Sequence, residues 1–465
     1  MQWAVRSDGK KGYIFCSNYL YKHDREDYKK VQFTVKLKEE TIRMPRQKTT
    51  VKGGTYFFWP FNLELGGIQL KYATAQPVCW VKEGKNRTYF FFEDDAIPAE
   101  YALAGENIAA IQTSKGICQK EKQGYFIHSL DAGRDCLVEI KQTDGSVVRL
   151  VTLTEEESDQ IWKGELEGKE FVALTSSALI VDKGNITLIY ESPSAQVSFF
   201  QNGGFMAPQC FQGEARNLRA KIQMVSPLSE ADYIAPAIGE ELTRVFRMHT
   251  FSEIEEAWLR YVSIGHASCE INGTQIESHL AGDYQLANVT KLLTTNLNTV
   301  TFHTEQPIAA EVEILLKNGQ RILWNTDATW LSSDKKPAQI AKVKRSPLSY
   351  APEEHLAVYK AYVPRPVGGE EEMRLYIDYR GDVANLYQNE QLIADSYYDG
   401  TDWIVSVDCL QEAADVNPLV IRIKGLESAD VPIYFEKEVN PADCVYPTLK
   451  SIDVKQEYRF QVVRK

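Results

Sequence analysis

Alternation of apolar and polar side chains is the feature of this sequence that most limits the folds open to it. In Val31-Gln32-Phe33-Thr34-Val35-Lys36-Leu37, apolar side chains fall on one face of an extended chain and polar ones on the other. Tyr458-Arg459-Phe460-Gln461-Val462 repeats the pattern. A period of two is typical of antiparallel strands with one buried face. Tyr89-Phe90-Phe91-Phe92 is apolar throughout, which predicts a strand covered on both faces.

Turn signals are frequent and helix signals are few. Five Asx-Gly pairs supply the positive φ angles that tight hairpins need: Asp8-Gly9, Asp144-Gly145, Asn272-Gly273, Asn318-Gly319 and Asp399-Gly400. Thr154 with Glu157 fits a capping box and predicts one short helix. Ser252 with Glu255 leaves a second helix or a strand open. We therefore predict an all-β chain of several antiparallel β-sandwich domains with few short helices.

The length of 465 residues is too great for one hydrophobic core, because cores stop growing beyond about 250–300 residues. Composition shifts mark the predicted boundaries: Gly105-Glu106-Asn107, the Gly- and Pro-rich residues 201–240, and Lys335 to Pro352. We predict an antiparallel β-sandwich over 1–104 and a small β domain over 105–200. A jelly-roll β-sandwich follows over 201–345, with an irregular linker over 201–240, and a C-terminal jelly-roll β-sandwich covers 346–465.

A weak internal repeat supports the two jelly rolls. Residues 257–304 and 373–424 share one order of features. In each copy a strand leads to a tight turn at Asn272 or Asn389. A Gly-containing loop then ends in an aromatic residue, Tyr284 or Trp403, and further strands follow. This order suits an eight-stranded jelly roll of the galactose-binding-like type.

Charge and hydropathy exclude several classes of partner. The chain has 52 Lys+Arg against 64 Asp+Glu, a formal net charge of −12, and its densest basic stretch, Ala341 to Arg345, lies in a predicted linker. Nucleic acid requires a clustered basic surface, so we expect no nucleic-acid partner. No apolar stretch approaches the ~18 residues that span a bilayer, so we expect no membrane span. Residues 1–30 lack the apolar middle region of a signal peptide.

Cysteine and histidine spacing gives no sign of a cofactor or metal. Eight Cys occur without a Cys-x-x-Cys pair, and they are expected to be small buried residues. His266 and Cys269 are three residues apart, but no second pair at ligand spacing follows. We predict no cofactor and no metal site, and a structural Ca²⁺ in a jelly roll stays open because no motif indicates one.

Acidic residues are abundant but are expected to be structural. Three acidic runs lie at predicted turns or caps: Glu93-Asp94-Asp95, Glu155-Glu156-Glu157 and Glu370-Glu371-Glu372. Asp378, Asp382, Asp399 and Asp402 gather on the loop-rich part of the second repeat, where Asp commonly bonds its own backbone. Nucleophile-elbow and phosphate-binding motifs are absent. No catalytic residue is predicted.

Aromatic residues give the better functional signal, since they make up 11% of the chain. Sugar rings present C–H faces that pack on flat side chains, while their hydroxyls seek carboxylates and amides. Two groups are candidate carbohydrate contacts: Trp403 with Asp402, Asp399 and Tyr398, and Trp59 with Tyr56. Core packing or domain docking is the alternative for both groups, because aromatic residues dominate interiors and interfaces.

Segments at both ends of the chain resemble glycoside hydrolase family 35. Gly54-Thr55-Tyr56-Phe57-Phe58-Trp59-Pro60-Phe61-Asn62-Leu63 and Gly67 to Pro77 resemble the region after the catalytic barrel in Bacteroidetes-type β-galactosidases. The runs Tyr89 to Glu100 and Leu375 to Ala384 are similar to the same region. The resemblance implies β-domains that follow a TIM barrel, in enzymes that cleave terminal β-galactosides with retention and are typically exported, to the periplasm or outside the cell.

The same family predicts an acid/base segment that this sequence lacks. Its Gly-Gly-Pro stretch leading to Gln-x-Glu-Asn-Glu-Tyr has no counterpart, and the eightfold strand–helix alternation of a barrel is missing. We therefore expect the non-catalytic β-sandwich portion of a β-galactosidase-like enzyme. It would have no activity alone, with a catalytic barrel and a galactoside-containing glycan as its partners. A stand-alone carbohydrate-binding protein and a purely structural interaction module are the alternatives.

Overall fold

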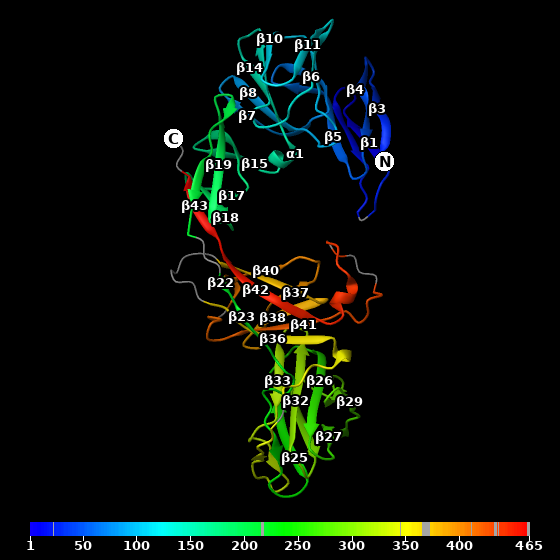
Figure 1. Ribbon diagram of the computed structural model, residues 1–465, viewed down its shortest axis with the longest axis vertical. Coiled ribbons are helices and arrows are strands. Elements are labelled where there is room, and N and C mark those ends of the chain that lie inside the picture. The colour runs from blue at the N-terminus through cyan, green and yellow to red at the C-terminus, as the bar shows by residue number, and fades with distance from the viewer. Residues whose placement is uncertain are drawn as a thin grey trace. The chain divides into compact units, whose positions relative to one another are not determined.

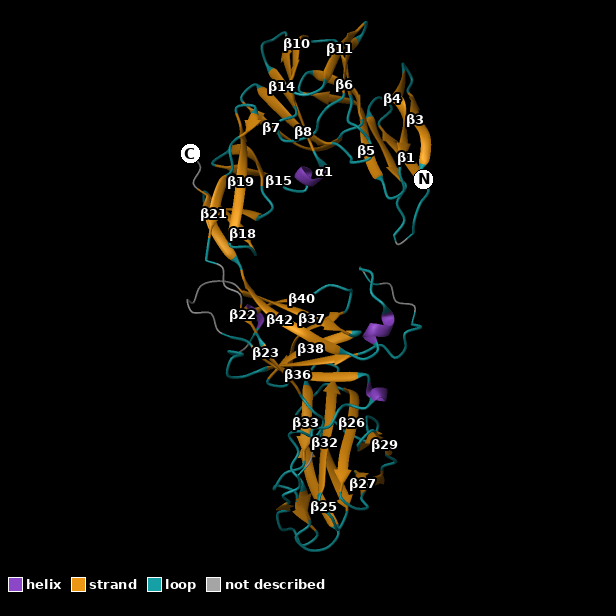
Figure 2. Cartoon of the chain, viewed as in Figure 1, coloured by secondary structure: helices purple, strands orange, loops and turns teal. Residues whose placement is uncertain are grey.

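The computed structural model describes residues 1–21, 23–214, 218–344, 346–364, 373–410, 412–431, 435 and 437–462. The chain folds into two compact units, Met1–Ala215 with Tyr458–Lys465 and Arg216–Glu457. Strands dominate both units (Figures 1 and 2). Among the described residues the α-helix is limited to α1 (Glu155–Ser158), beside the 3-10 turns η1 (Pro352–Glu354), η2 (Val407–Cys409) and η3 (Pro441–Cys444). The predicted all-β class is confirmed.

The first unit begins with two facing sheets and a hairpin. The larger sheet has the order β1 (Gln2–Ser7), β2 (Gly12–Ser17), β5 (Tyr56–Leu65), β6 (Ile68–Ala73), β9 (Tyr101–Ala104), β12 (Gly124–His128), β11 (Ile117–Glu121). The smaller has the order β10 (Ile108–Thr113), β13 (Leu137–Gln142), β14 (Val147–Leu153), β8 (Asn86–Phe92), β7 (Gln76–Glu83). The hairpin consists of β3 (Tyr28–Lys36) and β4 (Thr41–Val51).

Two further sheets complete this unit. One contains β15 (Ile161–Leu166), β16 (Lys169–Leu174), β19 (Ser194–Gln201), β20 (Gly204–Phe205) and β21 (Gln209–Gln212). The other contains β17 (Ala178–Asp182), β18 (Asn185–Tyr190) and β43 (Tyr458–Val462). The last strand of the chain therefore pairs with a strand about 270 residues earlier, in register Leu188↔Phe460.

Local sequence signals match this unit closely. Phe90 and Phe91 are both fully buried, in two different core clusters, so β8 is covered on both faces as its apolar run predicts. β8 also pairs in parallel with β14, an exception to the antiparallel rule of the fold. The capping box of α1 forms as predicted: the Thr154 hydroxyl accepts from the Glu157 amide at 3.1 Å, and the Glu157 carboxylate accepts from the Thr154 amide.

The second unit contains two sandwiches. In the first, one sheet has the order β29 (His279–Ala281), β30 (Tyr284–Asn288), β26 (Ile254–Ser263), β32 (Ile308–Leu316), β24 (Ile234–Ala235), β35 (Gln339–Ile340), with β33 (Arg321–Asn325) also on β32. The facing sheet has the order β28 (Thr274–Gln275), β27 (Ser268–Ile271), β31 (Leu297–His303), β25 (Glu241–Arg247), β34 (Leu331–Ser332). Ser252 precedes a strand, β26, and the Asn318-Gly319 hairpin joins β32 to β33 as predicted.

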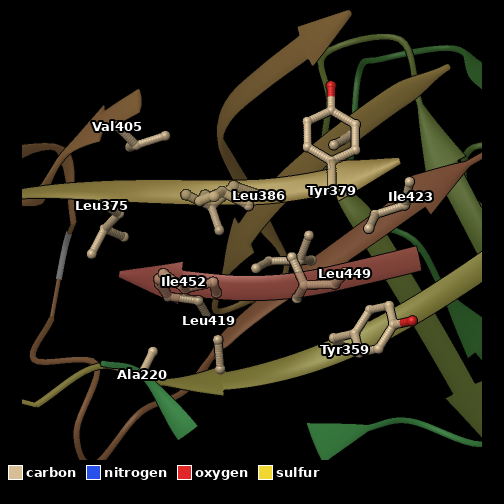
Figure 3. Close-up of a cluster of buried hydrophobic side chains, with 14 of the residues drawn as sticks. Ala220, Tyr359, Leu375, Tyr379, Leu386, Val405, Leu419, Ile423, Leu449 and Ile452 are labelled. Atoms are coloured by element: carbon tan, nitrogen blue, oxygen red, sulfur yellow. The ribbon is translucent and has the colours of Figure 1, made fainter. Parts of the chain in front are cut away.

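The C-terminal sandwich has sheets of four and five strands. Their orders are β22 (Leu218–Arg219), β42 (Thr448–Gln456), β37 (Met373–Arg380), β40 (Trp403–Ser406), and β23 (Lys221–Met224), β36 (Leu356–Tyr362), β41 (Leu419–Lys424), β38 (Val383–Gln388), β39 (Gln391–Tyr397). Side chains from both sheets, among them Leu375, Leu386 and Ile452, meet in one core (Figure 3). Two strands of the predicted linker 201–240, β22 and β23, form edges of this sandwich.

The internal repeat read from the sequence is present in the topology. The order β30-β26-β32 in the first sandwich has its counterpart in β40-β37-β42 of the second. In the facing sheets, β28-β27-β31-β25 corresponds to β39-β38-β41-β36. Each of these strands has the corresponding neighbours in the other sandwich, so the two sandwiches share this part of their topology. The jelly-roll name and the four domain boundaries stay predictions.

Candidate functional site

A group of exposed and half-buried aromatic side chains covers the outer face of β2 and β5. Tyr13 and Phe15 lie two residues apart on β2, and Phe15 faces Phe58 across the ladder. Ring centroids are 6.3 Å apart for Tyr13–Phe15 and 6.1 Å for Phe15–Phe58. Tyr56 continues the row, with the Tyr19 ring 6.2 Å away. We call Tyr13, Phe15, Tyr19, Tyr56 and Phe58 the aromatic face.

The alternation of the strands explains why these rings reach the surface. Ile14 and Trp59 point to the opposite side, into the core beneath the β3–β4 hairpin. Trp59 is 0% exposed and stacks on Phe57 with centroids 3.9 Å apart, whereas Tyr56 is 62% exposed. The predicted pair of Tyr56 and Trp59 is therefore split between two faces. Trp59 is a core residue, and Tyr56 belongs to a surface whose other members the sequence analysis did not select.

The chemistry of the aromatic face suits a hydroxyl-rich, partly apolar ligand. Phe15 and Phe58 form a stacked pair with an interplanar angle of 22°, and Phe15 is 41% exposed. Tyr19 and Tyr56 add hydroxyl groups at the other end of the row. Exposed aromatic side chains that lie side by side form a candidate interaction surface. The sequence pattern could have revealed the aromatic face, because Tyr13 and Phe15 alternate with residues that are buried in an apolar-rich strand.

The second predicted group, around Trp403, is largely built into the core. Tyr398 is 6% exposed and its ring lies 5.2 Å from Tyr379 and 5.7 Å from Phe435. The Arg380 guanidinium carbon lies 5.2 Å from the centre of the Tyr398 ring. Trp403 is half-buried and meets Tyr379 edge-on at 6.3 Å. Tyr398 is thus a packing residue, which limits this group as a sugar platform.

The two aspartates of that group lie at the surface. Asp399 accepts hydrogen bonds from the Thr401 amide at 2.8 Å and the Thr401 hydroxyl at 2.6 Å, so it closes a turn. These hydrogen bonds, the hydroxyl first, lower the pKa of Asp399. Asp402 is exposed beside the half-buried Trp403. Trp403 and Asp402 are thus adjacent at the start of β40, whereas the ring of Tyr398 is buried against Tyr379 and Phe435.

A buried ionic network, which the sequence analysis missed, lies on the outer face of β26 and β32. Arg260 donates to Glu311 at 3.1 Å and to Glu313 at 3.2 Å. It also donates to Glu354 of η1 at 2.8 Å. Arg321 donates to the other Glu313 oxygen at 2.8 Å. All five side chains are at most 6% exposed.

Residues from the C-terminal sandwich and from the segment at Leu228 also bond to this network. Arg422 of β41, in the C-terminal sandwich, approaches Glu313 at 3.5 Å. Glu390 of the β38–β39 turn pairs with Arg321 at 3.0 Å. The Leu228 amide donates to Glu311 at 2.7 Å. We call Arg260, Glu311, Glu313, Arg321, Glu354, Glu390 and Arg422 the junction network, because it joins the two sandwiches.

The pKa values of the two central carboxylates of the junction network are shifted in opposite directions. Burial alone would raise the pKa of Glu313, but Arg422, Arg321 and Arg260 outweigh it and lower the pKa far below its ordinary value. Burial raises the pKa of Glu311, against the opposing effect of Arg260. Because Glu313 is shared by three guanidinium groups, it acts as a fixed counter-ion rather than as an acid or base.

Three members of the acidic runs have structural roles. Glu93 accepts from the Ala99 amide at 2.6 Å and Asp94 from the Ala96 amide at 2.8 Å, which fixes one loop. Glu157 caps α1. The run Glu370-Glu371-Glu372 lies outside the described residues. Within the described part of the chain, no group of three or more His, Cys, Asp or Glu is arranged to hold a metal ion.

The described helices are all short, and none is long and apolar enough to cross a membrane. The eight cysteines are unpaired, and Cys16, Cys136, Cys269 and Cys444 are buried. Cys210 and Cys409 are exposed, so the expectation of small buried residues is wrong for these two. Burial raises the pKa of the Cys16 and Cys136 thiols to about 11, as expected for small core residues.

Comparison with known proteins gives only distant likenesses. No protein-family model and no curated protein matches the sequence. An α-L-rhamnosidase of Streptomyces avermitilis with bound L-rhamnose is similar over 85% of this chain and 40% of its own, with a TM-score of 0.24 and 11% identity. An α-L-rhamnosidase of Dictyoglumus thermophilum is similar over 79% and 47%, with a TM-score of 0.22 and 11% identity.

A lectin from Pleurotus ostreatus in complex with GalNAc is similar over 53% of this chain and 86% of its own, with a TM-score of 0.23 and 10% identity. The chain thus spans less than half the length of the two rhamnosidases. Likeness at this level carries no argument about the function of this chain. None of these three proteins is a family 35 β-galactosidase, so that resemblance stays a prediction.

Proposed function

We propose that this chain is the non-catalytic β-domain region of a β-galactosidase-like glycoside hydrolase, and that it binds a galactoside-containing glycan on its aromatic face. The single observation that carries the binding is the row of surface rings from Tyr13 to Tyr56. Aromatic rings offer a large apolar area in a fixed orientation, which suits the C–H face of a pyranose. We choose a galactoside as the ligand because the segment from Gly54 to Pro77 resembles family 35.

The state of the buried carboxylates supports a role without catalysis. Retaining and inverting glycosidases need two carboxyl groups on either side of an open sugar site. Glu311 and Glu313 are two carboxylates on the same face of β32, but both are buried and bonded to arginines. We expect no turnover of a nitrophenyl β-galactoside by the purified chain. Turnover that disappears when one carboxylate is replaced would overturn the non-catalytic assignment.

Calorimetric titration with galacto-oligosaccharides tests the binding site. We expect Tyr56→Ala and Phe15→Ala each to weaken binding about tenfold, since each removes a ring worth roughly 1–2 kcal/mol of contact. Tyr446→Ala is the matched control, because Tyr446 is 64% exposed, much like Tyr56 at 62%, but lies in the other unit. Equal affinities for all three variants would exclude the aromatic face as the site.

Docking of a catalytic barrel on the same face is the second candidate. It is favoured by β1, an edge strand next to β2 whose six residues are all exposed. Exposed edges are the usual sites for further pairing. This alternative predicts no glycan binding, together with association to a barrel-bearing protein that Phe15→Glu abolishes. Glycan binding by the chain alone would favour the first candidate.

A further inference from the structure

A polar cavity lies at the junction of the two sandwiches of the second unit. Its volume is about 360 Å³, at the lower end of the ~300–1,000 Å³ typical of ligand pockets. The first sandwich and the segment after it contribute Glu311, Arg321 and Tyr350; the C-terminal sandwich contributes Val358, Asn389 and Val420. We call this cavity the junction pocket. Boundaries between domains are common places for small-molecule sites.

The junction pocket opens into a neighbouring groove of about 500 Å³. The two share Val225, Ser226, Ser229, Glu230 and Lys360 on their walls, so this segment forms the mouth. Ser229 is exposed, whereas Glu311 and Arg321 at the inner end are 5% and 6% exposed. A molecule entering from the mouth therefore meets buried charged groups at the inner end.

Two side chains that line the junction pocket, Tyr350 and Arg321, each carry a donor that bonds no other described residue. The Tyr350 hydroxyl is one, although its ring is fixed over the Arg260 guanidinium at 5.1 Å. Arg321 uses Nε toward Glu313 and Nη1 toward Glu390, which leaves Nη2 unused within the described part of the chain. Both side chains line the cavity, so these donors are available to the hydroxyl groups of a polar occupant.

The charges around the junction pocket are already paired. Glu311 is bonded to Arg260, Arg321 to Glu390, and Glu230 to Lys360 at 2.5 Å. A charged ligand would compete with these partners and leave one of them unpaired in a buried place, which is expensive. A neutral ligand needs only the spare lone pairs of the carboxylates and the unused donors. The pairing therefore favours an uncharged ligand rich in hydroxyl groups.

We propose that the junction pocket binds a single neutral sugar ring or a polyol of similar size. Ligand hydroxyls donate to the carboxylates of Glu311 and Glu390 and accept from Arg321 and Tyr350. Val358 and Val420 supply an apolar wall for the C–H face of the ring. The junction network holds these groups in place before the ligand arrives. This site is separate from the aromatic face, so it does not depend on the function proposed above.

Saturation-transfer NMR and thermal-shift titration of the full chain with D-galactose, D-glucose and myo-inositol test the proposal. We expect at least one of them to bind with a dissociation constant in the millimolar range or below. Tyr350→Phe, which keeps the ring but removes the unused hydroxyl, should weaken binding at least tenfold. Ser229→Leu should block the mouth without touching the junction network. Tyr446→Phe is the control, because Tyr446 is exposed and does not line the junction pocket, and it should bind the monosaccharide normally.

Three outcomes would overturn the proposal. The first is that none of the neutral ligands binds up to about 100 mM while circular dichroism shows the native fold. The second is that Tyr350→Phe and Ser229→Leu both bind as tightly as the parent chain. The third is that the charged analogues D-galacturonate or D-glucosamine bind more tightly than the neutral sugars. Loss of binding in Tyr56→Ala alone would place the ligand on the aromatic face and equally refute the junction pocket.

Discussion

Glu313 shows how a single residue can depend on parts of the chain far away in sequence. On β32, Val312 and Ile314 point into the core, so alternation alone assigns Glu313 to solvent. Instead, Arg422 from the C-terminal sandwich and Arg260 from β26 cover Glu313, and only 1% of this residue is exposed. The periodicity of a strand tells which residues share a face, but not whether another element covers that face.

Replacing Glu313 by Gln should destabilise the second unit strongly. The change leaves Arg260, Arg321 and Arg422 buried around a neutral side chain, and breaking a buried pair in this way costs about 3–5 kcal/mol. Urea denaturation followed by fluorescence measures the free energy of unfolding. Glu253→Gln is the control, because its partner Lys317 and Glu253 itself are exposed, and we expect no measurable change. Equal stability of the two variants would refute a structural role for the network.

The effect of Glu313 should also depend on pH. Its folded-state pKa lies far below the ordinary value of 4.5, so the carboxylate contributes stability above about pH 4.5 that is lost as the pH falls. The difference in unfolding free energy between the parent chain and Glu313→Gln should therefore be largest near pH 7 and shrink toward pH 3. Denaturation at several pH values measures it. A difference that stays constant over this range would contradict the assigned charge state.

The spacing of the aromatic candidates along a strand could have separated surface residues from core residues, which composition alone does not do. Tyr56 and Trp59 are three apart on one strand, which places them on opposite faces. The burial of Tyr398 was not predictable in the same way, because Phe435, which packs on it, comes from a distant loop. Local pattern decides the side of a strand, and long-range packing decides the environment.

At the scale of elements, the hairpin β32–β33 connects the two sandwiches. Its turn glycine, Gly319, has φ +82°, and a Cβ there would come within 2.9 Å of the Leu392 Cβ on β39. The Arg321 amide donates to the Glu390 carbonyl at 2.9 Å in the same contact. The Asn-Gly signal predicted the turn itself. The close contact of Gly319 with Leu392 of the other sandwich could not be predicted from the neighbouring sequence.

Gly319→Ala should therefore destabilise the chain more than Gly273→Ala. Both glycines follow an asparagine and have positive φ, +82° and +77°, so both variants carry the same backbone strain of about 1 kcal/mol. Gly273 has open space around its missing Cβ, whereas Gly319 meets Leu392. The melting temperatures of the two variants measure the difference. A Gly273→Ala variant that is as unstable as Gly319→Ala would show that the contact with Leu392 is unimportant.

At the scale of the whole molecule, the chain returns at its end to its first unit. β43 pairs with β18, the Phe460 ring lies 5.6 Å from Phe211, and the Tyr458 hydroxyl donates to the Glu214 carbonyl at 2.7 Å. The alternation of Tyr458 to Val462 predicted this strand, and the repeated order of features predicted the shared plan of the two sandwiches. The partner of β43 was not predictable, because pairing between strands so distant leaves no trace in one sequence.

Removing residues 458–465 should loosen the first unit and leave the second unchanged. The truncation exposes the edge of β18 and the core around Leu188 and Phe211. Hydrogen exchange should accelerate in residues 178–190, while residues 373–410 and 448–456 keep their protection. The full-length variant Phe460→Ala should show the same effect to a smaller degree. Faster exchange in the second unit, or in neither, would contradict the division of the chain described above.

We propose that a glycan covers the row of rings on β2 and β5, and oxidative footprinting of the aromatic side chains tests this claim most directly. With galacto-oligosaccharide present, Phe15, Tyr19 and Tyr56 should become protected from hydroxyl radicals, whereas the exposed Tyr397 and Tyr446 should react as before. Unchanged labelling of Tyr56 and Phe15 under saturating glycan, with the sugar bound, would contradict the claim.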